Sequence, residues 1–154
     1  MELTQIIRSD AVRARFRTSS KKKRLLDMAV LAEEGYYLRA DPTFEAMQQR
    51  ESLGPTGVGG GVAIPHARLP ELDRVVGLFA TLEKPVDFDA VDGRPVDLVF
   101  VLLAPEQAGA EHLRALARVS RTLRDRTLCE KLRSTEDAAA LFAILTAPAA
   151  SQAA

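Results

Sequence analysis

The sequence Gly-Gly-Gly-Val-Ala-Ile-Pro-His occupies residues 59–66 and joins a glycine loop to a short apolar run that ends on a histidine. The apolar run at 62–64 predicts a short strand, and Pro65 excludes His66 from a helix interior because proline disfavours helical geometry before it. The pattern places an imidazole at a strand end, near glycine amides that can approach an anion closely because no Cβ intervenes. A neutral imidazole is nucleophilic near pH 7, so His66 is a candidate phosphoryl acceptor. The alternative is a hydrogen-bonded structural histidine.

Apolar segments on both sides of this stretch predict the strands of a sheet. Residues 12–16 alternate apolar side chains with arginines, which is the period-two pattern of a half-exposed strand. Residues 75–82 and 98–103 are nearly continuous apolar runs, as expected for strands covered on both faces. The segment 87–97 between them is rich in Asp, Gly and Pro and predicts a turn region.

Capping and turn residues delimit the predicted helices. Ser19 or Ser20 is expected to cap the first helix, which Gly35 is expected to end. Asp41, followed by proline, is expected to cap the second. Apolar side chains at helical spacing predict a long amphipathic helix over 113–123. The remaining predictions are a short helix at 128–132 and a last helix at 135–145 that opens on a capping box of Ser134 and Asp137.

Strands and helices alternate along the chain, which predicts one α/β domain with a central sheet covered by helices. The 154 residues are enough for a single core, and no repeat or long linker divides them. Residues 1–146 are predicted to form the domain. Residues 147–154, Ala-Pro-Ala-Ala-Ser-Gln-Ala-Ala, are predicted to be a disordered tail because they have little apolar surface to bury.

Composition excludes several classes of protein. The 21 Lys and Arg balance 21 Asp and Glu, and a net charge of zero argues against a nucleic-acid partner. The single cysteine, Cys129, cannot form an internal disulfide and is expected to be buried in a reducing cytosol. The N-terminus lacks the pattern of a signal peptide, and no apolar run approaches about 20 residues. We therefore expect a soluble, cytoplasmic protein with no membrane insertion.

A basic stretch at 8–24 contains eight Lys or Arg against one carboxylate, Asp10. Such a run is usually a solvated face, and the alternative is a patch that docks a partner protein. Metal and hydrolase sites are not indicated. Two histidines and a distant cysteine do not make a zinc cluster, and neither a Gly-x-Ser-x-Gly elbow nor a phosphate-binding loop of the Gly-Lys-Ser/Thr type is present.

The other histidine, His112, is a candidate partner for His66. It is predicted near the start of a helix that follows the strand at 98–103, and such a connection returns the helix start to the carboxyl end of the strand. There His112 could donate a hydrogen bond to a phosphoryl group on His66, and the alternative is a helix-surface histidine. The neighbouring carboxylate of Glu111 is expected to favour the charged imidazolium of His112.

Arg50 is predicted near the end of the second helix, and its planar fork of donors suits two phosphoryl oxygens. The residues three and four positions before it are Met47 and Ala46, so no carboxylate lies one turn back to pair with it. The alternative is a solvent-facing arginine. Arg68 either meets an acidic phosphodonor or is solvated.

A set of motifs in fixed order carries a family resemblance. Beside the core at 59–66, the set comprises Met-Gln-Gln-Arg-Glu-Ser-Leu-Gly-Pro-Thr-Gly-Val at 47–58, Ala-Arg-Leu-Pro at 67–70, Val-Asp-Phe-Asp-Ala-Val-Asp-Gly-Arg-Pro-Val-Asp at 86–97, Leu-Ala-Pro-Glu at 103–106 and Glu-His-Leu at 111–113. From about Val12 to Leu145 the chain resembles the type-2 enzyme IIA domains of the bacterial phosphotransferase system, the fructose/mannitol class. Within that class it looks most like the nitrogen-regulatory branch.

The resemblance implies a three-layer α/β/α sandwich with a mixed central sheet, and it implies roles for individual residues. His66 would be phosphorylated at Nε2, His112 would donate to the phosphoryl group, and Arg50 would clamp it. Thr56 is a weaker candidate for a hydroxyl contact to phosphate. Pro55 departs from the family pattern, because relatives often carry a serine before the threonine.

The resemblance also implies partners. The donor would be a phosphorylated HPr-like carrier protein, and the targets would be proteins such as a potassium transporter or a sensor kinase. No cofactor and no metal are expected. One alternative is a sugar-specific IIA component of the fructose/mannitol type that passes phosphate to a membrane permease. The other is a binding module that acts without phosphotransfer.

Overall fold

The computed structural model describes residues 1–18 and 20–147. Its strands are β1 (Ile7–Phe16), β2 (Gly57–Gly59), β3 (Val62–Ala63), β4 (His66–Leu69), β5 (Val76–Val86) and β6 (Val96–Pro105). Its helices are a 3-10 turn, η1 (Leu3–Gln5), and α1 (Arg24–Tyr36), α2 (Ala40–Ser52), α3 (Ala110–Leu123), α4 (Arg126–Arg133) and α5 (Ala138–Thr146).

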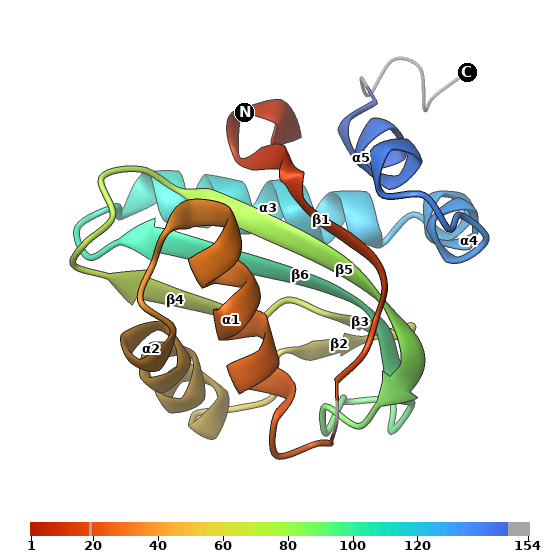
Figure 1. Ribbon diagram of the computed structural model, residues 1–154, viewed down its shortest axis with the longest axis horizontal. Coiled ribbons are helices and arrows are strands. Elements are labelled where there is room, and N and C mark those ends of the chain that lie inside the picture. The colour runs from red at the N-terminus through yellow and green to blue at the C-terminus, as the bar shows by residue number, and fades with distance from the viewer. Residues whose placement is uncertain (19, 148–154) are drawn as a thin grey trace.

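The six strands form one mixed sheet in the order β1-β5-β6-β3-β2, with β4 paired to the far end of β6. The pairs β1·β5, β3·β6 and β4·β6 are parallel, whereas β5·β6 and β2·β3 are antiparallel. Figure 1 shows α1 and α2 in front of this sheet and α3 behind it. The predicted three-layer α/β/α sandwich with a mixed sheet is therefore confirmed.

The core lies along β5 and β6. Every side chain from Leu98 to Ala104 is buried, and each large apolar side chain buried in this way contributes about 1.5–3 kcal/mol to folding. The rings of Phe79 and Phe100 face each other across the two strands, with centroids 6.3 Å apart. The two apolar runs thus form strands as predicted, and the segment between them joins an antiparallel pair.

The first strand and the first helix differ from the prediction. β1 begins at Ile7, before the alternating pattern is visible. α1 begins at Arg24, and Ser20 accepts a hydrogen bond from the Lys23 amide (3.3 Å) within the preceding turn. The lysines at 21–23 would oppose the dipole of a first helical turn, which explains the late start. Gly35 does not end the helix: it lies inside α1 over Ala11, and Tyr37 adopts the left-handed cap conformation at φ 58°.

The predicted caps of two other helices are also wrong. Arg39 is the N-cap residue of α2, so Asp41 lies inside the first turn, where a carboxylate favours the helix dipole. Asp137 caps α5 by accepting from the Ala140 amide at 3.0 Å, whereas the Ser134 hydroxyl donates to the Lys131 carbonyl. Ala147 follows α5, and the rest of the predicted tail, 148–154, lies outside the described residues.

The basic stretch is largely neutralised. Six of its eight cations form ion pairs: Arg8 with Asp10, Arg13 with Glu34, Arg15 with Glu136, Arg17 with Glu83, Lys21 with Asp87 and Asp89, and Arg24 with Glu51. This pairing favours a structural face over a docking patch. Cys129 is buried as predicted, and its thiol donates to the Leu123 carbonyl. Among the described helices, none combines the length and the apolar character needed to cross a bilayer.

Candidate functional site

The parallel pairing along β6 brings the two histidines together. His66 is the first residue of β4 and lies opposite Leu102, so it opens a strand where the sequence predicted that it would end one. The break comes from Pro65, which separates β3 from β4 while its carbonyl still accepts from the Leu102 amide at 3.0 Å. Because β6 is followed by α3, His112 returns to the same edge, and the two imidazole centroids lie 5.8 Å apart.

Both ring nitrogens of His66 have partners. Nδ1 lies 2.8 Å from the Ile64 carbonyl oxygen, and Nε2 lies 3.1 Å from Nε of Arg50. A carbonyl only accepts and a guanidinium only donates, so both contacts require the neutral ring with its proton on Nδ1. Burial, the largest cause, and the charge of Arg50 lower the pKa of His66 below its ordinary value, although the Ile64 hydrogen bond opposes them. Near pH 7 the Nε2 lone pair is therefore available.

Arg50 is held between its own helix end and His66. It lies in the last turn of α2, and its Nη1 donates to the Gly54 carbonyl at 2.9 Å while its Nε donates to His66. The turn that supplies this carbonyl closes through backbone bonds from Leu53 to Arg50 and from Gly54 to Glu51. The guanidinium is thus fixed beside Nε2 of His66.

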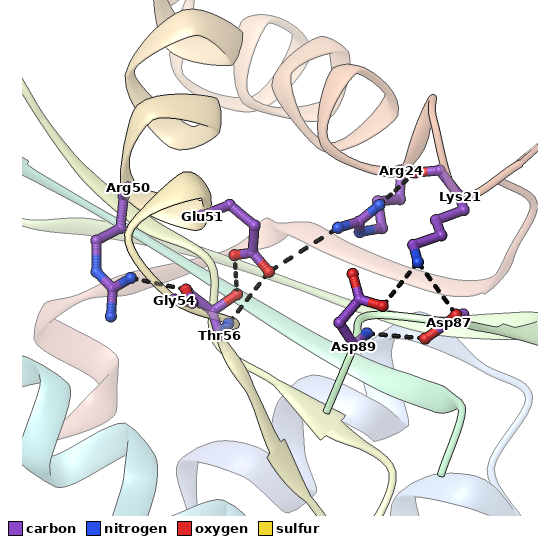
Figure 2. A network of polar contacts seen from close by, with 8 residues as sticks. All are labelled: Lys21, Arg24, Arg50, Glu51, Gly54, Thr56, Asp87 and Asp89. Atoms are coloured by element: carbon purple, nitrogen blue, oxygen red, sulfur yellow. Dashed lines mark hydrogen bonds and ion pairs between the residues drawn. The ribbon is translucent and has the colours of Figure 1, made fainter. Parts of the chain in front are cut away.

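Thr56 lies on the other side of this turn, as Figure 2 shows. It is 4% exposed, its hydroxyl donates to Oε2 of Glu51 at 2.5 Å, and its amide donates to Oε1 at 3.1 Å. The structure does not bring Thr56 to the histidines. Glu51, which reasoning from the sequence passed over, therefore links Thr56 to the helix that carries Arg50. A helix-terminal carboxylate before a Gly-Pro turn and a threonine was the signal that could have revealed it.

His112 is buried beside His66 and differs from the prediction in its charge. It is 6% exposed, and its Nδ1 is buried without a hydrogen-bond partner among residues 1–18 and 20–147. Burial is the largest cause that lowers the pKa of His112, and repulsion from the protonated form of His66 and from Arg68 adds to it. The expectation that Glu111 would favour the imidazolium is wrong, because that residue is exposed and burial dominates.

A pocket of about 410 Å³ opens over these side chains. It is lined by Ala46, Gln49, Arg50, Leu53, His66, Ala67, Arg68 and His112. Arg68 is exposed at its rim and donates to the Glu106 carbonyl at 3.2 Å. Two guanidinium groups, with no carboxylate in the described lining, make the pocket suitable for an anion. A larger hollow of about 650 Å³ beside α4 contains no histidine.

The glycine loop does not contribute its amides to this pocket. Gly60 donates to a carboxylate oxygen of Asp92 at 2.9 Å, and its carbonyl accepts from Arg133. Gly61 lies at the opposite end of β3 from His66, and a Cβ there would approach Arg133 within 2.5 Å. The glycines therefore serve the tight β2–β3 turn, and the sequence-based expectation of amides near His66 is wrong. No cluster of three or more metal-binding side chains occurs within the described ranges.

Comparisons with known sequences identify the family of the chain. The family model described as the phosphoenolpyruvate-dependent sugar phosphotransferase system, EIIA 2, matches residues 5–147. A nitrogen regulatory protein of Bradyrhizobium diazoefficiens is 48% identical over 153 residues, which cover 99% of this chain and 100% of the relative. A nitrogen regulatory protein of Escherichia coli is 40% identical over 147 residues, covering 95% and 90%.

Solved structures show the same fold. The crystal structure of the nitrogen regulatory protein IIA-Ntr from Neisseria meningitidis has a TM-score of 0.86 at 36% identity and covers 94% of this chain and 99% of its own. The mannitol IIA of Escherichia coli has a TM-score of 0.74 at 20% identity, covering 90% and 97%, and shares the fold. The chain therefore belongs to the EIIA 2 family of the phosphoenolpyruvate-dependent sugar phosphotransferase system and is similar along nearly its whole length to members named nitrogen regulatory protein.

Proposed function

We propose that the chain accepts a phosphoryl group on Nε2 of His66 from a phosphorylated HPr-like protein and acts on protein partners according to its phosphorylation state. Its family membership makes it a phosphotransferase component of the IIA type, and the proposal concerns the acceptor atom, the donor and the use of the phosphoryl group. The observation that supports it most strongly is the neutral His66 ring, with Nδ1 on a carbonyl and Nε2 facing Arg50.

The transfer balances without a cofactor. The Nε2 lone pair of His66 forms the new N–P bond while the N–P bond of the donor's phosphohistidine breaks and its electron pair returns to the donor nitrogen. The proton stays on Nδ1 throughout and remains hydrogen-bonded to the Ile64 carbonyl oxygen. Arg50 gives up its bond to Nε2 as that lone pair is used, and its donors turn to the phosphoryl oxygens. The charge in the loose, in-line transition state is then offset by guanidinium groups already in place.

His112 supports the product. Its Nδ1 has no partner in the described part of the unphosphorylated protein, and its pKa is lowered by burial. A phosphoryl dianion on the ring 5.8 Å away reverses this balance, because a nearby negative charge favours the imidazolium. His112 then takes up a proton and donates a hydrogen bond to a phosphoryl oxygen.

A regulatory role is favoured over sugar transport by the pattern of identity. Relatives named nitrogen regulatory protein reach 48% and 40%, whereas a fructose-specific EIIA component of Haloferax volcanii reaches 38% over 112 residues. Targets of the kind implied by the nitrogen-regulatory resemblance are a potassium transporter or a sensor kinase, met in the cytoplasm. Transfer of the phosphoryl group to a sugar permease is the second candidate, favoured by that fructose-specific relative.

Intact-mass spectrometry tests the acceptor. The chain is incubated with phosphoenolpyruvate, enzyme I and an HPr-type carrier, and we expect it to gain the mass of one acid-labile phosphoryl group. The variant His66→Ala should gain none, while the carrier in the same mixture remains phosphorylated. Equal labelling of the two proteins would reject His66 as the acceptor.

A further inference from the structure

We propose that Glu51 is a positioning residue that holds Arg50 against His66, and that Thr56 serves the site through Glu51 instead of touching the phosphoryl group. The kinetic consequence rests on the proposed function, whereas the positioning itself is a property of the unphosphorylated protein. The inference replaces the direct phosphate contact that the family resemblance suggests for Thr56.

The contacts form a chain from Thr56 to His66, and Figure 2 displays its part from Thr56 and Glu51 to Gly54 and Arg50. Both carboxylate oxygens of Glu51 accept from Thr56, one from its amide at 3.1 Å and the other from its hydroxyl at 2.5 Å. These bonds close the turn at 53–56 against the end of α2. The same turn presents the Gly54 carbonyl to Nη1 of Arg50 at 2.9 Å, and Nε of Arg50 reaches Nε2 of His66. A turn that opens would release the carbonyl that fixes the guanidinium.

The chain of contacts continues to α1 through Arg24. The side chains of Glu51 and Arg24 are only 7% and 12% exposed, and Oε1 of Glu51 lies 4.0 Å from Nη2 of Arg24. Arg24 also stacks over the Phe88 ring at 4.9 Å and donates to the Lys21 carbonyl. Arg24 places a cation beside this buried carboxylate, and its own position is fixed by packing. Glu51 is therefore held by contacts to α1 as well as by its two bonds from Thr56.

A direct role for Glu51 in chemistry conflicts with its placement. Its oxygens face Thr56, it does not line the pocket over the histidines, and a carboxylate there would repel an incoming phosphoryl group. Thr56 likewise lies outside that pocket. Both side chains can therefore act on Arg50 only through the turn between them.

A double-mutant cycle distinguishes support through Glu51 from direct contact by Thr56. We expect phosphorylation of His66 by the HPr-type carrier to slow about tenfold in Thr56→Val and about 10- to 30-fold in Glu51→Met, as for loss of a hydrogen bond to a charged group. The double variant should be as slow as Glu51→Met alone, because removal of the Glu51 carboxylate already removes the acceptor of the threonine hydroxyl. Losses that multiply would mean that Thr56 acts independently of Glu51 and would overturn the proposal.

Conservative variants separate positioning from loss of folding. Glu51→Gln can accept the Thr56 amide and donate to its hydroxyl oxygen, so it should retain a transfer rate within about threefold of the wild type. Thr56→Ser keeps the hydroxyl and should do the same. Glu83→Gln, the same change in a carboxylate that pairs with Arg17 elsewhere, is the matched control and should leave the rate unchanged.

A readout free of phosphotransfer uses the Arg50 side chain in the unphosphorylated protein. Solvent exchange of its Nε–H, followed by nitrogen-15 NMR, reports the bond to Nε2 of His66, and we expect exchange at least about tenfold faster in Thr56→Val. Unchanged exchange in Thr56→Val and Glu51→Met would overturn the proposal. Faster exchange in a chain that the carrier fails to phosphorylate would leave the positioning intact and reject the proposed function.

Discussion

The two histidines occupy one pocket, but their surroundings prepare them for different roles. His66 has a carbonyl at Nδ1 and a guanidinium at Nε2, so its tautomer and the direction of its lone pair are fixed before a donor arrives. His112 is more deeply buried, and its Nδ1 has no partner in the part of the chain that the structure describes. Both rings have a lowered pKa, mainly because of burial.

This difference shows that charge state alone does not select a nucleophile. The two imidazoles, with ring centroids 5.8 Å apart, both have a lowered pKa, and what separates them is which nitrogen is tied down and what faces the other. His66 is organised to give its lone pair along one direction. Nδ1 of His112 has unused hydrogen-bonding capacity, which suits a residue that would donate to a phosphoryl group placed on His66.

The largest effect is expected at the group that organises His66. Arg50→Lys keeps the charge but loses the fork that spans Gly54, His66 and later two phosphoryl oxygens, so transfer should slow while the fold persists. By analogy with loss of a single oxyanion donor, the barrier should rise by about 2–4 kcal/mol, or about 30- to 1,000-fold in rate. Rapid-quench phosphorylation with the carrier measures this. A rate equal to that of the wild type would remove Arg50 from the site.

A smaller effect is expected at His112, because in the proposed mechanism it stabilises the transferred group without forming a bond to phosphorus. His112→Ala should still be phosphorylated at His66, but on the order of tenfold more slowly, as expected for one charge-assisted hydrogen bond of about 1.5 kcal/mol. His112→Gln should recover part of this loss, since its amide still donates. Kinetics of both variants check the prediction, and equal rates in Ala and Gln would assign His112 a packing role only.

The smallest expected effect is a shift in the pH dependence of the rate at which His66 accepts the phosphoryl group. In the proposed mechanism the reactive form of His66 is the neutral ring, and the pKa of His66 lies below the ordinary value of 6.5. Acceptance should therefore persist as the pH falls through 6.5 and decline only at the lower folded pKa. Arg50→Met should move the decline upward in pH, because the charge of Arg50 helps to lower that pKa. An NMR titration of the His66 ring measures both values. A pKa at or above 6.5 in the wild type would contradict the neutral site.

Local patterns predicted β1, β3, β5 and β6, but they missed the short strands β2 and β4 and several boundaries. The apolar runs of β5 and β6 identified the core strands because burial on both faces leaves no other pattern. β1 was seen only in part, since its exposed residues at 8–10 show no alternation. The start of α1 was misplaced because two serines offered caps that the lysines after them opposed.

The features of the site also fall into those that the sequence predicted and those that it did not. His66, His112 and Arg50 were predicted from motifs, and the structure brings them to one edge of the sheet. The misassigned features depend on contacts that no local pattern encodes. The glycine loop turns toward Asp92 and Arg133, and burial sets the charge of His112 more strongly than the adjacent Glu111 does. The bond from Thr56 to Glu51 is different, because the carboxylate at the helix end before the Gly-Pro turn was a usable signal in the sequence.

The most direct test of this contrast identifies which of the four imidazole nitrogens takes the phosphoryl group. Protein labelled with nitrogen-15 in its histidine rings is phosphorylated by the carrier, and ring nitrogen shifts and couplings to phosphorus are recorded under alkaline conditions that preserve phosphohistidine. We predict a single N–P bond at Nε2 of His66, with the proton retained on Nδ1. A phosphoryl group on either nitrogen of His112, or on Nδ1 of His66, would contradict the roles assigned to the two rings.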